Sequence, residues 1–93
     1  MNIEYLKYFS ELAKIQHYGK AAKALNISQP GLSHAIKSLE EEYGVLLFNR
    51  KPHLSLTEAG EVMFQYLRST KILESNMERT LQEMSAGRKG SFT

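Results

Sequence analysis

Two helical patterns separated by a short corner lie within residues 20–44, and this segment constrains the fold more than any other. Residues 20–25 are rich in Ala and Lys, which favour a helix. Asn26 tolerates the left-handed conformation that ends many helices, and Ser28 can cap the next helix through its hydroxyl. Two short helices joined by so tight a corner are typical of a helix-turn-helix, so the first functional hypothesis is DNA binding.

The helix predicted after Ser28 has an apolar face and a polar face. The apolar residues recur at the spacing of one buried stripe and are Leu32, Ile36, Leu39 and Tyr43. Pro30 suits the first turn, and Gly44 can end the helix as a left-handed cap. The polar face carries side chains that can reach base edges or phosphates, namely Gln29, Ser33, His34, Lys37 and Ser38. An acidic cluster, Glu40 to Glu42, lies at the far end. The pattern alone leaves open an ordinary helical hairpin with a solvated face.

The residues before the corner predict one more helix and a break. Asn2 can cap a first helix whose broad apolar face, around Leu6 and Phe9, backs the other two helices. The pattern breaks at residues 17–19, and Gly19 is the expected cap of the second helix. The formal net charge is +2, and this basic excess lies within residues 1–52, together with the helix-turn-helix.

After Gly44 the pattern changes from helical to extended. Residues 45–48 form a short apolar run, residues 54–56 alternate with period two, and a basic loop with Pro52 joins them. The segment predicts a small two-stranded β-wing. Its basic residues are expected at or near the tip, where they would contact phosphates or the adjacent minor groove: Arg50, Lys51 and His53. A solvated hairpin tip is the alternative when this segment is considered alone.

From Thr57 the helical period returns for about thirty residues, longer than a small domain needs. Thr57 is a good N-cap, and acidic residues follow in the first turn. Apolar and small residues form a heptad seam, which consists of Ala59, Met63, Tyr66, Thr70, Leu73, Met77, Thr80 and Met84, widened by Val62, Leu67 and Leu81. The seam implies a partner helix, and a symmetric dimer is the favoured interpretation. A core helix of a larger chain is the alternative.

Other classes of protein find less support. The chain has no cysteine, which excludes disulfides, a thiolate nucleophile and cysteine-based zinc sites. No cofactor or metal site is predicted, and an enzyme is not expected, because no catalytic constellation and no phosphate loop is present. Neither a signal-peptide pattern nor an apolar run of membrane length occurs, so the expected location is cytoplasmic, with no membrane partner. The rival function is a coiled-coil adaptor that binds protein and not DNA.

Several motifs together resemble the N-terminal winged helix-turn-helix of LysR-type bacterial transcriptional regulators. They are Ala21-Ala22, Leu25, Ser28-Gln29-Pro30, Leu32-Ser33, Leu39-Glu40, Gly44, Leu47-Phe48, Arg50 and Leu56-Thr57-Glu58-Ala59-Gly60. The resemblance covers residues 1 to about 86, and the combination at these spacings is highly specific. It implies a mainly α fold, in which a three-helix winged helix-turn-helix with a short two-stranded β-wing precedes a long C-terminal linker helix.

The resemblance also implies an organisation and partners. Residues 1–57 are expected to form the DNA-binding domain, residues 58–86 the linker and dimerisation helix, and residues 87–93 a hinge toward an absent effector-binding domain. The expected DNA partner is a double-stranded interrupted palindrome near a promoter. Linker helices would pair antiparallel in a homodimer, or in a tetramer of the full-length protein, and a small-molecule effector would bind only the absent domain.

The predicted contact residues follow from these patterns. The DNA-binding set is Ser28, Gln29, Pro30, Ser33, His34, Lys37, Arg50, Lys51 and His53, and the dimerisation set is Met63, Tyr66, Thr70, Leu73, Met77, Leu81 and Met84. The chain departs from the family pattern at three places. His34 replaces a frequent Arg, and Leu46 replaces a frequent Pro. The wing is about one residue shorter than the common form and has His53 where an Arg is frequent. The departures at His34 and in the wing affect the expected base and groove contacts.

Overall fold

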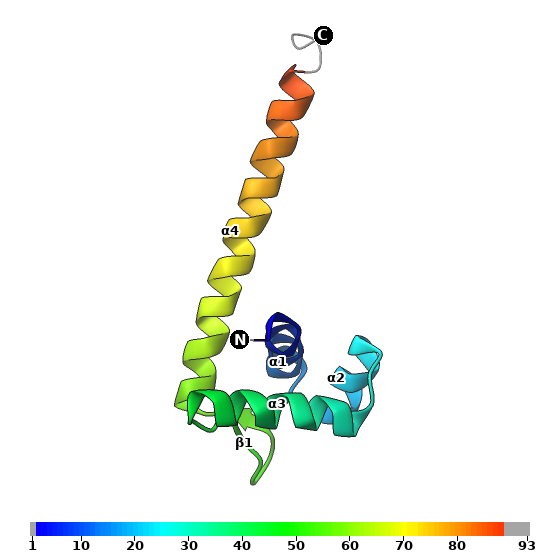
Figure 1. Ribbon diagram of the computed structural model, residues 1–93, viewed down its shortest axis with the longest axis vertical. Helices are drawn as coiled ribbons and strands as arrows, with labels where there is room; N and C mark the ends of the chain where they lie inside the picture. Colours follow the sequence, from blue (N-terminus) through cyan, green and yellow to red (C-terminus); the bar gives the residue numbers. More distant parts are fainter. Residues whose placement is uncertain (1, 89–93) are drawn as a thin grey trace.

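A computed structural model describes residues 2–88, which contain four helices and one two-stranded sheet (Figure 1). The elements in chain order are α1 (Ile3–Ile15), α2 (Tyr18–Leu25), α3 (Gln29–Tyr43), β1 (Phe48–Asn49), β2 (Ser55–Leu56) and α4 (Glu58–Arg88). The first three helices and the sheet form the winged domain, and α4 extends away from it. The predicted mainly α, winged helix-turn-helix fold is confirmed.

Local capping interactions set the bounds of the helices. Asn2 Oδ1 accepts a hydrogen bond from the backbone N–H of Tyr5 at 3.1 Å, as expected for the cap of α1. The cap of α2 is His17, whose Nδ1 accepts from the N–H of Lys20 at 3.0 Å. The prediction that Gly19 caps this helix is wrong, because the imidazole supplies an acceptor that glycine lacks.

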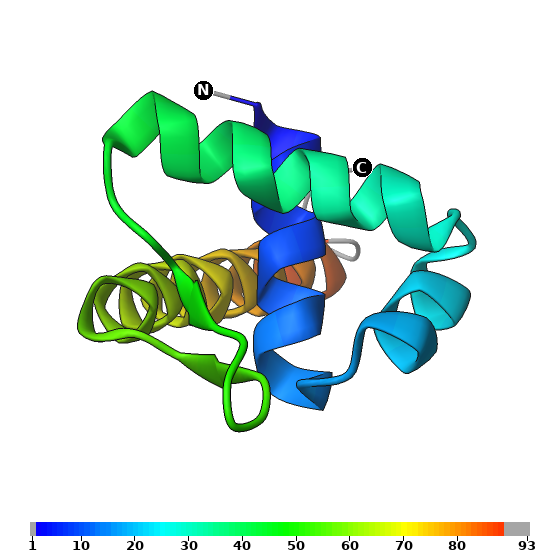
Figure 2. The same cartoon turned by 90° about the horizontal axis from the view of Figure 1, so that it is seen from below.

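The core lies where α1 crosses α3, with α2 and the sheet closing its sides (Figure 2). Its largest fully buried side chains are Phe9, Leu12, Leu32, Ile36, Leu39, Leu47 and Phe48. The rings of Phe9 and Phe48 lie 5.4 Å apart between centroids, so the first strand of the wing packs directly on α1. Tyr43 was predicted in the buried stripe but is 42% exposed, because the last turn of α3 extends past the edge of this core.

The wing is an antiparallel pair with Phe48 opposite Leu56 and Asn49 opposite Ser55. The first strand is shorter than the apolar run predicted, since Val45 and Leu46 are exposed and only Phe48 and Asn49 pair. Helix α4 then begins with Thr57 Oγ1 accepting from the N–H of Gly60 at 3.0 Å.

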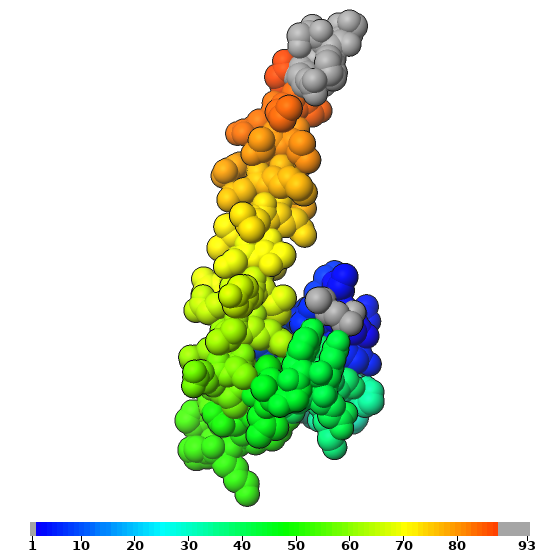
Figure 3. Space-filling model, turned by 60° about the vertical axis from the view of Figure 1, so that its left-hand side comes forward, coloured from blue at the N-terminus to red at the C-terminus, as the bar shows by residue number. Residues whose placement is uncertain are grey.

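Only the first turns of α4 pack on the domain. Ala59, Met63, Phe64 and Leu67 contact the core, while the rest of the helix stands clear of the domain (Figures 1 and 3). The molecule consequently measures 59 Å along its longest axis, against 26 and 22 Å along the others. The helix continues through Gly87 and Arg88, which the sequence predicted as hinge, and the remaining hinge residues, 89–93, lie outside the described residues. No helix within residues 2–88 has both the length and the apolar character to cross a membrane.

Candidate nucleic-acid interface

The turn between α2 and α3 presents the start of α3 to solvent. Asn26 adopts the left-handed conformation, with φ 60° and ψ 42°, and ends α2. Ser28 Oγ accepts from the N–H of Gly31 at 3.0 Å, so the hydroxyl caps α3 as predicted. Gln29 and Pro30 therefore occupy the first turn of α3, and both side chains are exposed.

The exposed face of α3 carries four predicted contact residues in one stripe. Pro30, Ser33, His34 and Lys37 are spaced by three and four residues, and all four are exposed. Leu32, Ala35, Ile36 and Leu39 are buried on the other side of the helix. The structure thus presents one cation, a hydroxyl, an imidazole and an apolar ring together on the surface of the second helix of the motif.

His34 has a neighbour that the sequence did not predict. The ring of Tyr5, from the first turn of α1, lies 6.4 Å from the imidazole between centroids, in an edge-on arrangement. Tyr5 also stacks on Tyr8, with centroids 6.1 Å apart. No local pattern relates α1 to α3, so only the crossing of the two helices reveals this contact.

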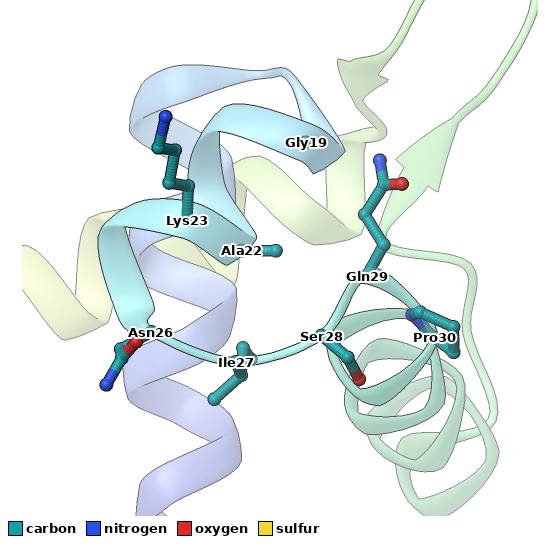
Figure 4. A pocket seen from close by; sticks show the side chains of 8 residues that line it. All are labelled: Gly19, Ala22, Lys23, Asn26, Ile27, Ser28, Gln29 and Pro30. Atoms are coloured by element: carbon teal, nitrogen blue, oxygen red, sulfur yellow. The ribbon is translucent and has the colours of Figure 1, made fainter.

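An open concavity of about 650 Å³ lies between α2 and α3 (Figure 4). Its lining residues are Gly19, Ala22, Lys23, Asn26, Ile27, Ser28, Gln29 and Pro30. Figure 4 shows the side chains of Lys23 and Gln29 on opposite sides of it, with Ser28 between the helices. The exposed amine of Lys23 was not among the predicted contacts, although its position in α2, next to the corner, was a signal that could have identified it.

The three basic residues of the wing are all exposed, but Arg50 has contacts that the sequence did not predict. Lys51 and His53 are exposed in the loop between β1 and β2, where the Lys51–Pro52 bond is cis. Arg50 instead contacts groups of the domain itself: Nη1 donates to the carbonyl oxygen of Phe48 at 3.3 Å, and Nη2 donates to the hydroxyl of Tyr18 at 3.2 Å. Arg50 is therefore bound to the domain through its guanidinium while its side chain remains 46% exposed.

Glu40, the first residue of the acidic cluster at the end of α3, is only 8% exposed. Its Oε2 accepts from the backbone N–H of Leu47 at 2.8 Å and of Phe48 at 3.4 Å, and lies 3.8 Å from Nη1 of Arg50. Glu40 follows Ile36 by four residues and so lies at the edge of the buried stripe. This spacing is the sequence feature that could have predicted its burial. The carboxylate therefore ties the end of α3 to the strand that leads into the wing.

Tyr18 completes this set of polar contacts. Burial raises the pKa of its hydroxyl above the ordinary value of 10.0, and the nearby Arg50 partly offsets that effect. The hydroxyl is therefore protonated at neutral pH and can accept the hydrogen bond from Arg50. Within the part of the chain that the structure describes, every fully buried side-chain nitrogen or oxygen has a hydrogen-bond partner.

The predicted dimerisation residues fall into two groups. Met63 is half-buried against the winged domain. The others lie beyond or beside that contact and are exposed: Tyr66, Thr70, Leu73, Met77, Leu81 and Met84. Tyr66 and Leu73 are 73% and 69% exposed, so nothing within residues 2–88 covers this part of the stripe. Among residues 2–88, no three His, Cys, Asp or Glu side chains are grouped so as to hold a metal ion.

Comparison with known families and proteins gives one consistent result. Residues 3–61 match the family described as bacterial regulatory helix-turn-helix protein, lysR family. The HTH-type transcriptional regulator BudR of Klebsiella aerogenes is 52% identical over 66 residues, which are 70% of this chain and 46% of BudR. AlsR of Bacillus subtilis (strain 168) is 48% identical over 69 residues, which are 73% of this chain and 23% of AlsR. The chain thus spans less than half the length of these two relatives.

Solved structures agree with this assignment. The crystal structure of the BenM DBD/catB site 1 DNA complex has a TM-score of 0.79 and 31% identity, over 91% of this chain and 97% of that one. Full-length OxyR C199D from Pseudomonas aeruginosa has a TM-score of 0.74 and 36% identity, over 89% of this chain and 28% of that one. The chain belongs to the lysR family of bacterial regulatory helix-turn-helix proteins.

Proposed function

We propose that this chain binds double-stranded DNA in a sequence-specific manner, as the DNA-binding part of a transcriptional regulator. The observation that carries the proposal is the exposed stripe of polar and cationic side chains on α3, presented by the second helix of a helix-turn-helix and flanked by a basic wing. An α-helix of this kind fits the major groove, where base pairs present distinct donor and acceptor patterns. The likeness to a structure titled as a DNA complex supports it.

The proposal assigns different tasks to the contact residues. Gln29, Ser33, His34 and Lys37 face base edges or nearby phosphates, and Pro30 offers an apolar contact to a thymine methyl group. Ser28 caps α3 beside the backbone. Lys51 and His53 contact phosphates or the adjacent minor groove. Arg50, whose side chain is 46% exposed, also donates to groups of the domain, so the main wing contacts are assigned to Lys51 and His53.

The exposed stripe of α4 is assigned to a second copy of the chain. Paired linker helices would present two winged domains to an interrupted palindrome, with residues 1–57 as the DNA-binding domain and 58–86 as the dimerisation helix. Residues 87–93 would lead to an effector-binding domain, where a small molecule would bind, in a full-length dimer or tetramer. This organisation rests on family membership and on the uncovered stripe.

Selection of bound sequences from random double-stranded DNA, at about 50 and about 200 mM salt, tests the function. The expected result is enrichment of an interrupted palindrome. Retention of no DNA at the lower salt concentration would contradict the proposal and favour a protein-binding adaptor. Repeating the selection with His34→Arg should shift the preferred base toward guanine, which a forked guanidinium recognises, whereas unchanged sequences would remove His34 from the base contacts.

A further inference from the structure

Three side chains from three different segments meet behind the wing. Tyr18 opens α2, Glu40 lies near the end of α3, and Arg50 directly follows β1. Arg50 connects the other two, since it donates to the Tyr18 hydroxyl at 3.2 Å and lies 3.8 Å from the Glu40 carboxylate. It also donates to the carbonyl oxygen of Phe48, in the strand that leads to the wing loop.

The burial of Glu40 explains why these contacts matter. A buried carboxylate is stable only when it is paired and hydrogen-bonded. The Glu40 side chain is 9% exposed, and its partners are the N–H groups of Leu47 and Phe48 and the guanidinium of Arg50. All three partners belong to residues 47–50, at the start of the wing. The hydrogen bonds and the ion pair that stabilise the buried carboxylate therefore also hold this segment against α3.

We propose that Tyr18, Arg50 and Glu40 form a positioning network that holds the wing in place relative to the helix-turn-helix. Arg50 is then a positioning residue that acts through Lys51 and His53, and its guanidinium is not itself a phosphate contact. The network sets how far the wing loop lies from the exposed face of α3. This inference rests on the proposed DNA-binding function for its consequence, but its structural content concerns the wing alone.

A charge-conserving substitution separates the two roles of Arg50. Lys keeps the positive charge but lacks the planar fork that reaches two partners at once. If Arg50 positions the wing, Arg50→Lys and Arg50→Gln should both weaken binding to the selected DNA by about ten-fold. If Arg50 instead contacts phosphate, Arg50→Lys should bind about as tightly as the unmodified chain. Thermal unfolding of each variant confirms that it is folded.

A double-mutant cycle tests whether Tyr18 affects the DNA contact made by Lys51. Tyr18→Phe removes one hydroxyl without changing the charge. In the unmodified chain Lys51→Ala should weaken binding about ten-fold, and in the Tyr18→Phe background only about two-fold, because a displaced wing has less contact to lose. The matched control is Tyr8→Phe, which removes a hydroxyl bonded to Glu4 on α1 and should leave the Lys51→Ala effect at full size. Equal Lys51→Ala effects in all three backgrounds would overturn the inference.

Amide hydrogen exchange tests the inference without DNA. Exchange of the Leu47, Phe48 and wing-loop amides should rise about ten-fold or more in Tyr18→Phe, as expected when one hydrogen bond to a charged group is lost. It should stay unchanged in Tyr8→Phe. Unaltered exchange in Tyr18→Phe would overturn the positioning network even if DNA binding is established. Conversely, a chain that retains no DNA but shows the faster exchange would refute the proposed function and support the network.

Discussion

At the scale of single residues, Gly60 is where α4 meets the segment before the wing. The backbone N–H of Thr57 donates to the carbonyl oxygen of Leu47 at 3.0 Å, and the Thr57 hydroxyl donates to that of Leu46. These bonds hold the first turn of α4 close to the backbone of Leu47. A Cβ at position 60 would therefore overlap the Leu47 carbonyl and press on the Leu56 side chain. Only glycine fits there without moving the backbone.

Gly60→Ala should therefore lower the free energy of unfolding by roughly 1–3 kcal/mol, the usual cost of overpacking. Urea denaturation at constant protein concentration measures it. Gly87→Ala is the matched control in the same helix, since nothing lies within 4 Å of its added methyl, and helix propensity then favours Ala by up to about 1 kcal/mol. Equal stability of Gly60→Ala and the unmodified chain would mean that the start of α4 can shift.

Lys51 is the residue whose predicted role has a simple electrostatic signature. Lys51→Ala should weaken binding to all DNA sequences and reduce the slope of log affinity against log salt by about one unit, as one phosphate contact is lost. Lys71→Ala is the control with the same change in charge, because Lys71 is exposed on α4, far along the chain from the wing. A slope that is the same for both variants would show that Lys51 contacts no phosphate.

At the scale of elements, the surroundings of α4 change along its length. Its first turns bury Met63, Phe64 and Leu67 against the domain. Further along, Leu73 and Met77 are exposed and continue the heptad stripe that includes Met63, at a height where the domain no longer covers it. Ile72 is also exposed, but it points roughly 100° away from Leu73.

Leu73→Asp should produce monomers at micromolar concentration in sedimentation experiments, because a charge would be buried in the proposed helix pair. The fold should survive, since Leu73 is exposed in the single chain. Ile72→Asp introduces the same charge one residue away, outside the stripe, and should leave the dimer intact. A Leu73→Asp chain that stays dimeric would place the interface elsewhere.

At the scale of the whole molecule, most of α4 stands clear of the winged domain (Figure 3). If two copies pair through this helix as proposed, they would bind DNA as a bivalent unit, and the second contact would gain from a high effective concentration. Affinity for a palindrome should then exceed affinity for one half-site far more than two-fold.

This bivalency predicts a specific result for the dimer variant. On DNA with both half-sites, Leu73→Asp should bind about 10²- to 10⁴-fold more weakly than the unmodified chain, while both should bind a single half-site alike. Titration of the two duplexes at one salt concentration measures the difference. An equal loss on both duplexes would indicate damage to the winged domain instead of lost pairing.

The features that sequence reasoning predicted correctly are local ones. Asn26, Ser28 and Gly44 cap helices through their own backbone conformations or side chains, so neighbouring residues suffice to identify them. The apolar spacing of α3 likewise identified its exposed face, because helical periodicity alone decides which residues share a side. The length of α4 followed from the same periodicity.

What the tertiary structure alone decided depends on segments far apart in the chain. The contacts of Arg50 with Tyr18 and Glu40 join residues far apart in the chain, and whether Tyr43 is buried depends on where the core under α3 ends. The contact between Tyr5 and His34 exists only because α1 crosses α3. Short-range propensities and caps act within a few residues, whereas burial and charge pairing depend on the three-dimensional neighbours that the fold brings together.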